Sequence, residues 1–149
     1  MKASKIILSL FILTAVGLFI PQMAFCQTEK LGMVQYTPPK DWKKTANENV
    51  VVFSELNQTT GRFCIITLYG ATASSGNPQS DFITAWNSLA VKNMNAKANP
   101  ETETQTADGW TIIAGASAMS SEGIKGAAFL TVISGFGKTV SVLAVFNDQ

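Results

Sequence analysis

The chain has 149 residues, enough for one domain with a hydrophobic core but too few for two ordinary domains. Charged residues make up only 14% of it and the formal net charge is +1, so charge favours binding neither to nucleic acid nor to an acidic membrane surface. Histidine is absent, which excludes Ser/His/Asp and Cys/His catalysis and histidine-based zinc sites. Lysine or carboxylate chemistry is the weakest hypothesis left, and we expect no catalytic, cofactor-binding or metal-binding residue and a protein that is not an enzyme.

The first 26 residues have the parts of a signal peptide. Lys2 and Lys5 give a positive start, an apolar run over 6–20 follows, and Pro21 ends the run. A membrane-spanning helix needs roughly 20 apolar residues, and this run is shorter. We therefore expect export to the periplasm or the extracellular space, with membrane contact only through the signal peptide before cleavage, and a single domain over 27–149.

Small residues mark the expected cleavage site, because Ala24 and Cys26 lie three and one before a cut that would leave Gln27 at the mature amino terminus. The alternative is a lipoprotein anchored at Cys26. Lipoprotein processing requires a small residue before the cysteine, and Phe25 is large. Simple cleavage is therefore the favoured interpretation.

A short strand is expected over 32–37, ended by Pro38 and Pro39, because neither proline can donate to a strand ladder. The two prolines make the following turn rigid and direct Trp42 back along the sheet. We interpret Trp42 as a hydrophobic plug at the end of the sheet rather than as a ligand platform, because one aromatic residue alone makes no site. Trp110, which follows an Asp-Gly turn, is expected to do the same at the opposite end.

Two strands are expected at 49–56 and 62–69, followed by a Gly/Ser-rich loop at 70–78. The second strand is apolar on both alternating faces, which predicts a central strand covered on both sides. It contains Cys64, which has no disulfide partner once Cys26 is removed. We expect Cys64 to be a buried, unreactive thiol.

One helix is expected over 80–96, with Ser80 or Asn77 as its cap and Pro78 in its first turn. Five of its apolar residues recur at helical spacing. These are Phe82, Trp86, Leu89, Ala90 and Met94. Nothing in this stripe requires a cofactor, so we interpret it as core.

Alternating apolar residues then predict four strands joined by short turns, which requires antiparallel neighbours. These strands are expected at 102–106, 110–119, 124–134 and 139–147. Glu101 and Glu103 alternate with threonines, as on the solvated face of an edge strand. The segment 134–139 ends like a phosphate-binding loop, but Val132 stands where that loop needs glycine and a strand follows, so a hairpin turn is expected.

Together these elements predict an α+β fold, with a mostly antiparallel sheet of about six to seven strands and one long amphipathic helix on one face. The segments TPPKDW, SDFITAWNSL and ADGWTIIAG occur in this order between residues 37 and 115. In this arrangement the chain resembles the PsbP and DcrB group of small exported proteins, and still more a set of signal-bearing proteins from Bacteroidota. The resemblance implies an α/β/α sandwich whose members are mostly non-catalytic assembly factors, accessory subunits or binding modules.

The chain departs from this group in one respect, because no second helix follows the last expected strand. The helix is expected to approach the sheet over the small residues Ala114, Gly115, Ala116, Gly126 and Ala128. The other face would then expose Phe129, Ile133, Val140, Val142 and Phe146, a larger apolar surface than a monomer usually tolerates. Either the natural chain continues past Gln149 into a closing helix, which we favour, or this face meets a protein partner or a second copy.

These observations favour an exported, non-catalytic cell-envelope protein that binds another protein or assists assembly. The alternative is a small-ligand module for an amphiphile, with its mouth between the loop at 70–78 and the end of the helix.

We expect the mature protein to begin at Gln27 without a lipid, because Phe25 disfavours lipoprotein processing. Mass spectrometry of the purified protein's amino terminus tests this expectation. A diacylated Cys26 would contradict it.

Overall fold

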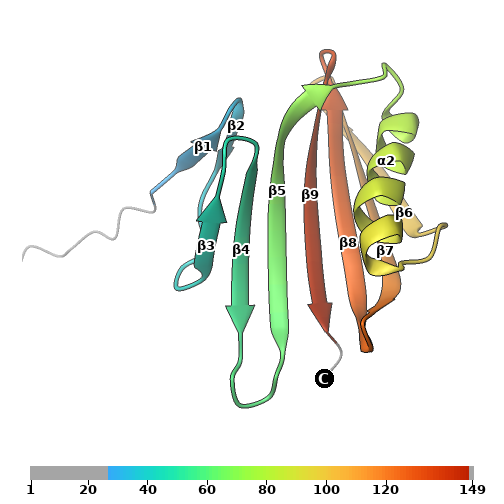
Figure 1. Cartoon of the computed structure of the whole chain (residues 1–149). Coiled ribbons are helices and arrows are strands. Elements are labelled where there is room, and N and C mark those ends of the chain that lie inside the picture. Colours follow the sequence, from blue (N-terminus) through green and yellow to red (C-terminus); the bar gives the residue numbers. More distant parts are fainter. Residues whose placement is uncertain (1–26, 148–149) are drawn as a thin grey trace, which may run out of the picture.

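The computed structural model describes residues 27–147 (Figure 1), so the expected signal peptide lies outside the described residues. They form nine strands and one continuous helix. In chain order the strands are β1 (Glu29–Leu31), β2 (Val34–Tyr36), β3 (Lys43–Ala46), β4 (Val50–Leu56), β5 (Phe63–Ala73), β6 (Glu101–Ala107), β7 (Trp110–Ser121), β8 (Ile124–Gly135) and β9 (Lys138–Asn147). The helix consists of α2 (Pro78–Trp86), a π-helical segment (Asn87–Val91) and α3 (Lys92–Met94).

Seven of the strands form one antiparallel sheet in the order β3-β4-β5-β9-β8-β7-β6, which confirms the expected α+β fold. The hairpins β6–β7, β7–β8 and β8–β9 each turn on two residues with positive φ, which matches the right-handed twist of the strands. The last of these turns is Phe136-Gly137, so the segment 134–139 is a hairpin and not a phosphate loop.

The helix begins at Pro78 and ends at Met94, each two residues before the limits expected from the sequence, 80 and 96. The Asn77 side chain accepts a hydrogen bond from the Ser80 N–H, and Pro78 occupies the first turn, so Asn77 rather than Ser80 is the cap. After Trp86 the helix widens into the π-helical segment and then returns to α-helix in α3. Asn95, in the left-handed conformation with φ 51°, ends the helix.

One face of the sheet is covered by this helix, which lies over β7 and β8. Phe82, Trp86 and Ala90 are buried there against Ile113, Leu130, Val132 and Leu143. A Cβ on Gly115 would overlap the Phe82 ring, so this glycine allows the helix to approach the sheet closely. The expected small-residue contact is therefore present at Gly115 and Ala128, whereas Ala114 and Ala116 point to the opposite face by strand alternation.

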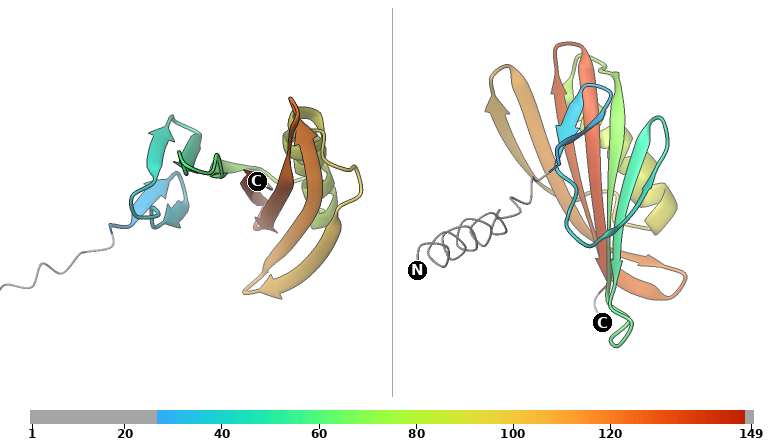
Figure 2. Two further views of the ribbon diagram at one scale, coloured as in Figure 1. Left: turned by 90° about the horizontal axis from the view of Figure 1, so that it is seen from below. Right: turned by 90° about the vertical axis from the view of Figure 1, so that its left-hand side faces the viewer.

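The opposite face is covered in part by the hairpin β1–β2, which lies beside β3 and β4 (Figure 2) and shares a buried cluster with β4, β5 and β9. Leu31 is buried there with Val51, Phe53, Leu68 and Val140. Lys44 of β3 forms an ion pair with Glu29 of the hairpin, and the Tyr36 hydroxyl donates to the same carboxylate at 2.8 Å. Hydrogen bonds from Lys44, which has the larger effect, and from Tyr36 lower the pKa of Glu29.

Three expectations about the strands are wrong. The segment 32–37 is not one strand of the main sheet: Gly32 has φ +59° and turns the chain between two short strands. The strand β3 was not expected, because its residues are all exposed and show no apolar alternation. The expected loop at 70–78 begins only at Ser74, because β5 continues to Ala73.

The cover over β5 also differs from expectation. The helix lies mainly on β7 and β8, so it covers β5 only in part: Phe63 and Tyr69 pack against the helix-side core, but Leu68 is the one buried residue of β5. Cys64 is half-buried rather than buried. On the hairpin side, Val140 is buried and Val142 packs against the hairpin cluster, so these two are not part of an exposed face. Phe129 and Phe146 stay exposed at 45% and 36%.

Replacement of Gly115 by alanine should lower the free energy of unfolding by about 1–3 kcal/mol, because the buried Phe82 ring cannot move away without opening the core. Urea unfolding of the native protein and the Gly115→Ala variant measures this. Ala114→Ser, at an exposed neighbouring position, is the matched control and should be nearly neutral. Equal midpoints for Gly115→Ala and native protein would contradict the close approach.

Candidate functional site

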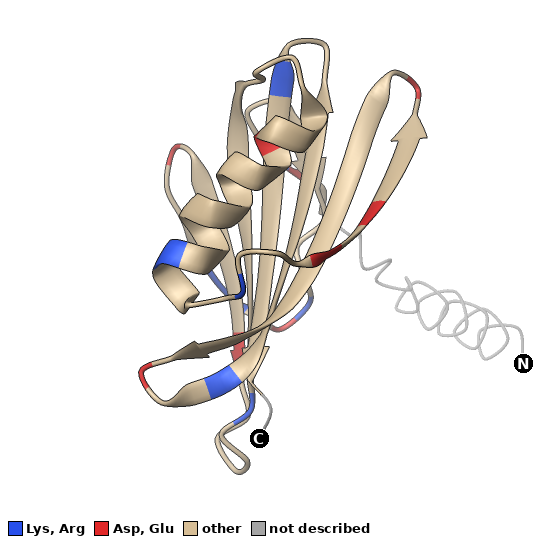
Figure 3. Ribbon diagram, turned by 90° about the vertical axis from the view of Figure 1, so that its right-hand side faces the viewer, with Lys and Arg blue, Asp and Glu red and all other residues tan. Residues whose placement is uncertain are grey.

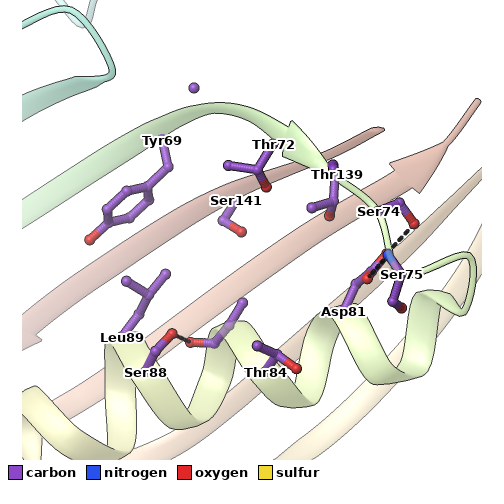
Figure 4. A pocket seen from close by; sticks show the side chains of 13 residues that line it. Tyr69, Thr72, Ser74, Ser75, Asp81, Thr84, Ser88, Leu89, Thr139 and Ser141 are labelled. Carbon is purple, nitrogen blue, oxygen red and sulfur yellow. Dashed lines mark hydrogen bonds between the residues drawn. The ribbon is translucent and has the colours of Figure 1, made fainter. Parts of the chain in front are cut away.

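A groove of about 460 Å³ lies between the helix and the part of β5 and β9 that the helix does not cover (Figure 4). Most of the side chains that line it carry hydroxyl groups, and we call it the hydroxyl groove. These hydroxyl residues are Tyr69, Thr72, Ser74, Ser75, Thr84, Ser88, Thr139 and Ser141. The small-ligand hypothesis placed its mouth between the 70–78 segment and the end of the helix. The groove borders that segment at Ser74 and Ser75, and the helix from Asp81 to Leu89.

A β-bulge brings two of these residues to the same side of the sheet. Tyr69 pairs with Ser141 and Thr72 with Thr139, so three steps along β5 match two steps along β9. In a regular strand, residues three apart point to opposite faces. The extra residue therefore turns both Tyr69 and Thr72 towards the helix. Gly70 lies within the bulge and donates its N–H to the Asn49 carbonyl at 2.7 Å.

The helix supplies the facing wall of the hydroxyl groove. Asp81, Thr84, Ala85, Ser88 and Leu89 have the spacing of one side of an α-helix, next to the buried stripe of Phe82 and Trp86. This polar side was not predicted from the sequence, where only the apolar stripe of the helix was interpreted. The alternation of small and hydroxyl residues beside the stripe was the signal that could have found it.

At the end of the hydroxyl groove, Asp81 joins the helix to the preceding loop. Its carboxylate accepts hydrogen bonds from the Ser74 hydroxyl at 2.6 Å and the Ser75 N–H at 2.8 Å. Burial alone would raise the pKa of Asp81, but hydrogen bonds from Ser74, Ser75 and Ser134 outweigh burial and hold it at about 2. A carboxylate with this pKa is a poor general base, so the close Ser74–Asp81 pair does not resemble an activated nucleophile.

The sequence-predicted aromatic residues lie elsewhere. Trp42 is half-buried against the hairpin cluster, where it packs as core. Trp110 packs edge-on against Phe136 with ring centroids 5.2 Å apart. Trp110 also lines a second cavity of about 410 Å³, together with Met33, Val34, Ile112, Ile133 and Val140. This apolar pocket lies beside the hairpin β1–β2.

The remaining candidates form no reactive centre. Burial, and to a smaller extent the Glu55 carboxylate, raise the pKa of the Cys64 thiol, which favours its less reactive protonated form. Glu101 and Glu103 are exposed on the edge strand β6. Within residues 27–147, no three Cys, Asp or Glu side chains gather as a metal site would require. Charged residues are few and scattered on the helix side of the molecule (Figure 3).

Removal of the Asp81 charge should destabilise the protein in a pH-dependent way. The folded pKa of about 2 is below the usual 3.8, so the stabilisation is present above pH 3.8 and is lost as pH falls towards 2. Asp81→Asn should lower the free energy of unfolding at neutral pH by about 1–2 kcal/mol and flatten its decrease between these pH values.

Urea unfolding of both proteins over this pH range measures the effect. Glu103→Gln, at an exposed position on β6, is the control and should follow the native curve. Coincident curves for Asp81→Asn and native protein would show that the Ser74–Asp81 contact contributes nothing to stability.

The sequence matches no protein-family model, and no curated protein is significantly similar to it. Within residues 27–147, none of the helical structure is long and apolar enough to cross a membrane.

Proposed function

We propose that this chain is an exported, non-catalytic cell-envelope protein that binds another protein through the part of the sheet left open by the hairpin β1–β2. We call this surface the open face, and define it by Ala114, Ala116, Ala127, Phe129, Ala144 and Phe146, which strand alternation places on the hairpin side of β7, β8 and β9. The signal peptide expected from the sequence supports export.

The observation that carries the proposal is the pair of exposed phenylalanines. Phe129 and Phe146 lie on neighbouring strands with ring centroids 5.6 Å apart and nearly parallel planes. Phe129 is flanked in its cross-strand row by Ala116 and Ala144, and Phe146 by Ala127 and Cys64. The two large rings project from a row of small side chains and form an apolar protrusion. Large aromatic side chains of this kind are common at the centre of protein–protein interfaces.

The charge at the rim indicates the kind of partner. Glu101 and Glu103 of β6 point to the same side as the open face, since they pair with Ala116 and Ala114. Lys125 of β8 lies on the same side near the β7–β8 turn, so the acidic edge of the open face is the one along β6. An apolar centre with this acidic edge fits a partner surface in which basic residues lie beside an apolar group. We therefore favour a different protein with this chemistry over a second copy of the chain.

The resemblance of TPPKDW, SDFITAWNSL and ADGWTIIAG to the PsbP and DcrB group adds support, because that group consists mostly of assembly factors and binding modules. In the α/β/α arrangement that it implies, the hairpin β1–β2 would occupy part of the position of the second helix. The open face is then the part that the hairpin does not reach.

A second candidate function is binding of a small amphiphile. The observation that favours it is the apolar pocket beside the hairpin, whose volume of about 410 Å³ and Trp110 wall suit an apolar group. This pocket adjoins the open face through Ile133, so one surface could serve both functions.

The test places a photo-crosslinking benzoylphenylalanine at position 129 of the full-length protein in the cells that make it. We expect one discrete cross-linked protein, and a weaker product when Glu101→Gln and Glu103→Gln are introduced. The control carries the same cross-linker at Thr104, which is exposed on β6 but points to the other face. A cross-linked product that contains only this chain would overturn the proposal of a different partner and show that the open face binds a second copy. The absence of any product at position 129 would refute the open face as a binding surface.

A further inference from the structure

The hydroxyl groove lies on the helix side of the sheet, opposite the open face. It is part of neither the protein-binding surface nor the apolar pocket. Four of its hydroxyl groups, on Tyr69, Thr72, Thr84 and Ser141, have no hydrogen-bond partner among the described residues. They come from β5, β9 and the helix, and the close-up shows them on facing walls (Figure 4). Hydroxyl groups that can both donate and accept are therefore directed at one space from two sides.

The charge of the lining limits the ligand. No lysine or arginine lines the hydroxyl groove, so it offers no cation to an anionic ligand. Asp81 is its one carboxylate, and the hydrogen bonds from Ser74 and Ser75 already engage both carboxylate oxygens. A cationic ligand would have to compete with these hydrogen bonds. The lining therefore favours a neutral ligand.

The apolar part of the lining limits the ligand further. Tyr69 is half-buried and faces Leu89 across the groove, with Ala85 beside it on the helix. An aromatic ring with an apolar body and a polar tip suits a ligand that carries C–H groups on one side and hydroxyl groups at its edge. The volume of about 460 Å³ is within the range of about 300–1,000 Å³ typical of small-molecule sites.

We propose that the hydroxyl groove binds a neutral saccharide, with a sugar ring against Tyr69 and its hydroxyl groups bonded to Thr72, Thr84 and Ser141. The bulge in β5 is the feature that makes this possible, because it turns both Tyr69 and Thr72 into the groove. The saccharide site is independent of the open face, since the two lie on opposite sides of the sheet.

The test uses two-dimensional NMR of the processed, ¹⁵N-labelled protein titrated with maltose, cellobiose and diacetylchitobiose. We expect at least one of these neutral disaccharides to shift the amide signals of Gly70, Thr72 and Ser141. Glucuronate, a charged sugar, should leave them unchanged. The absence of shifts with all three disaccharides, or equal shifts with glucuronate, would overturn the proposal.

Variants locate the binding. Thr72→Val combined with Ser141→Ala should raise the Kd about tenfold, because each removes a hydrogen-bonding hydroxyl that the ligand uses. Tyr69→Phe retains the ring and should have a smaller effect. Thr104→Val, an exposed hydroxyl on β6, and Phe129→Ser, on the open face, are controls that should bind like native protein.

Thermal unfolding followed by circular dichroism confirms that each variant is folded. Unchanged affinity in the folded Thr72→Val, Ser141→Ala variant would refute the site. Because Phe129→Ser affects only the open face, failure of the saccharide site and failure of the protein-binding proposal are distinguishable.

Discussion

A sheet of seven strands has two faces to bury, and this chain covers them with one helix and one short hairpin. Neither cover spans all the strands. The helix packs on β7 and β8, and the hairpin packs on β4, β5 and β9 from the other side. The strand β9 belongs to both cores, because Leu143 faces the helix and Val140 faces the hairpin. The offset leaves one open area on each face, and the two proposed binding surfaces are these areas.

The elements that the sequence predicts well are those with local causes. Two-residue turns ending in glycine predict the β7–β8–β9 meander, and Asn77-Pro78 with the spacing of Phe82, Trp86 and Ala90 predicts the helix. The elements that it predicts poorly depend on tertiary contacts. Alternation shows that both faces of β5 are apolar, but it cannot show which element covers them. The hairpin strands are three residues long, too short for a periodic signal.

The hydroxyl groove shows the same division. The helix and the polar loop before it are visible in the sequence, so a groove between the two could be expected there. The inward direction of Tyr69 and Thr72 could not, because it depends on a one-residue mismatch between β5 and β9. Gly70 is the one residue whose presence in the sequence could have indicated that bulge. However, a glycine inside a Gly/Ser-rich segment is equally typical of a loop. The irregular position in the sheet is thus also the one that shapes the candidate site.

The position of β9 has a consequence for assembly of the fold. It follows all the other strands in the chain but lies in the middle of the sheet, between β5 and β8. Its pairing with β8 closes a tight turn, whereas its pairing with β5 joins segments far apart in sequence and costs more loop entropy. Until the second pairing forms, β3, β4 and β5 are a separate three-stranded unit with unpaired edges. Loss of β9 would therefore divide the sheet into two halves rather than shorten it at one side.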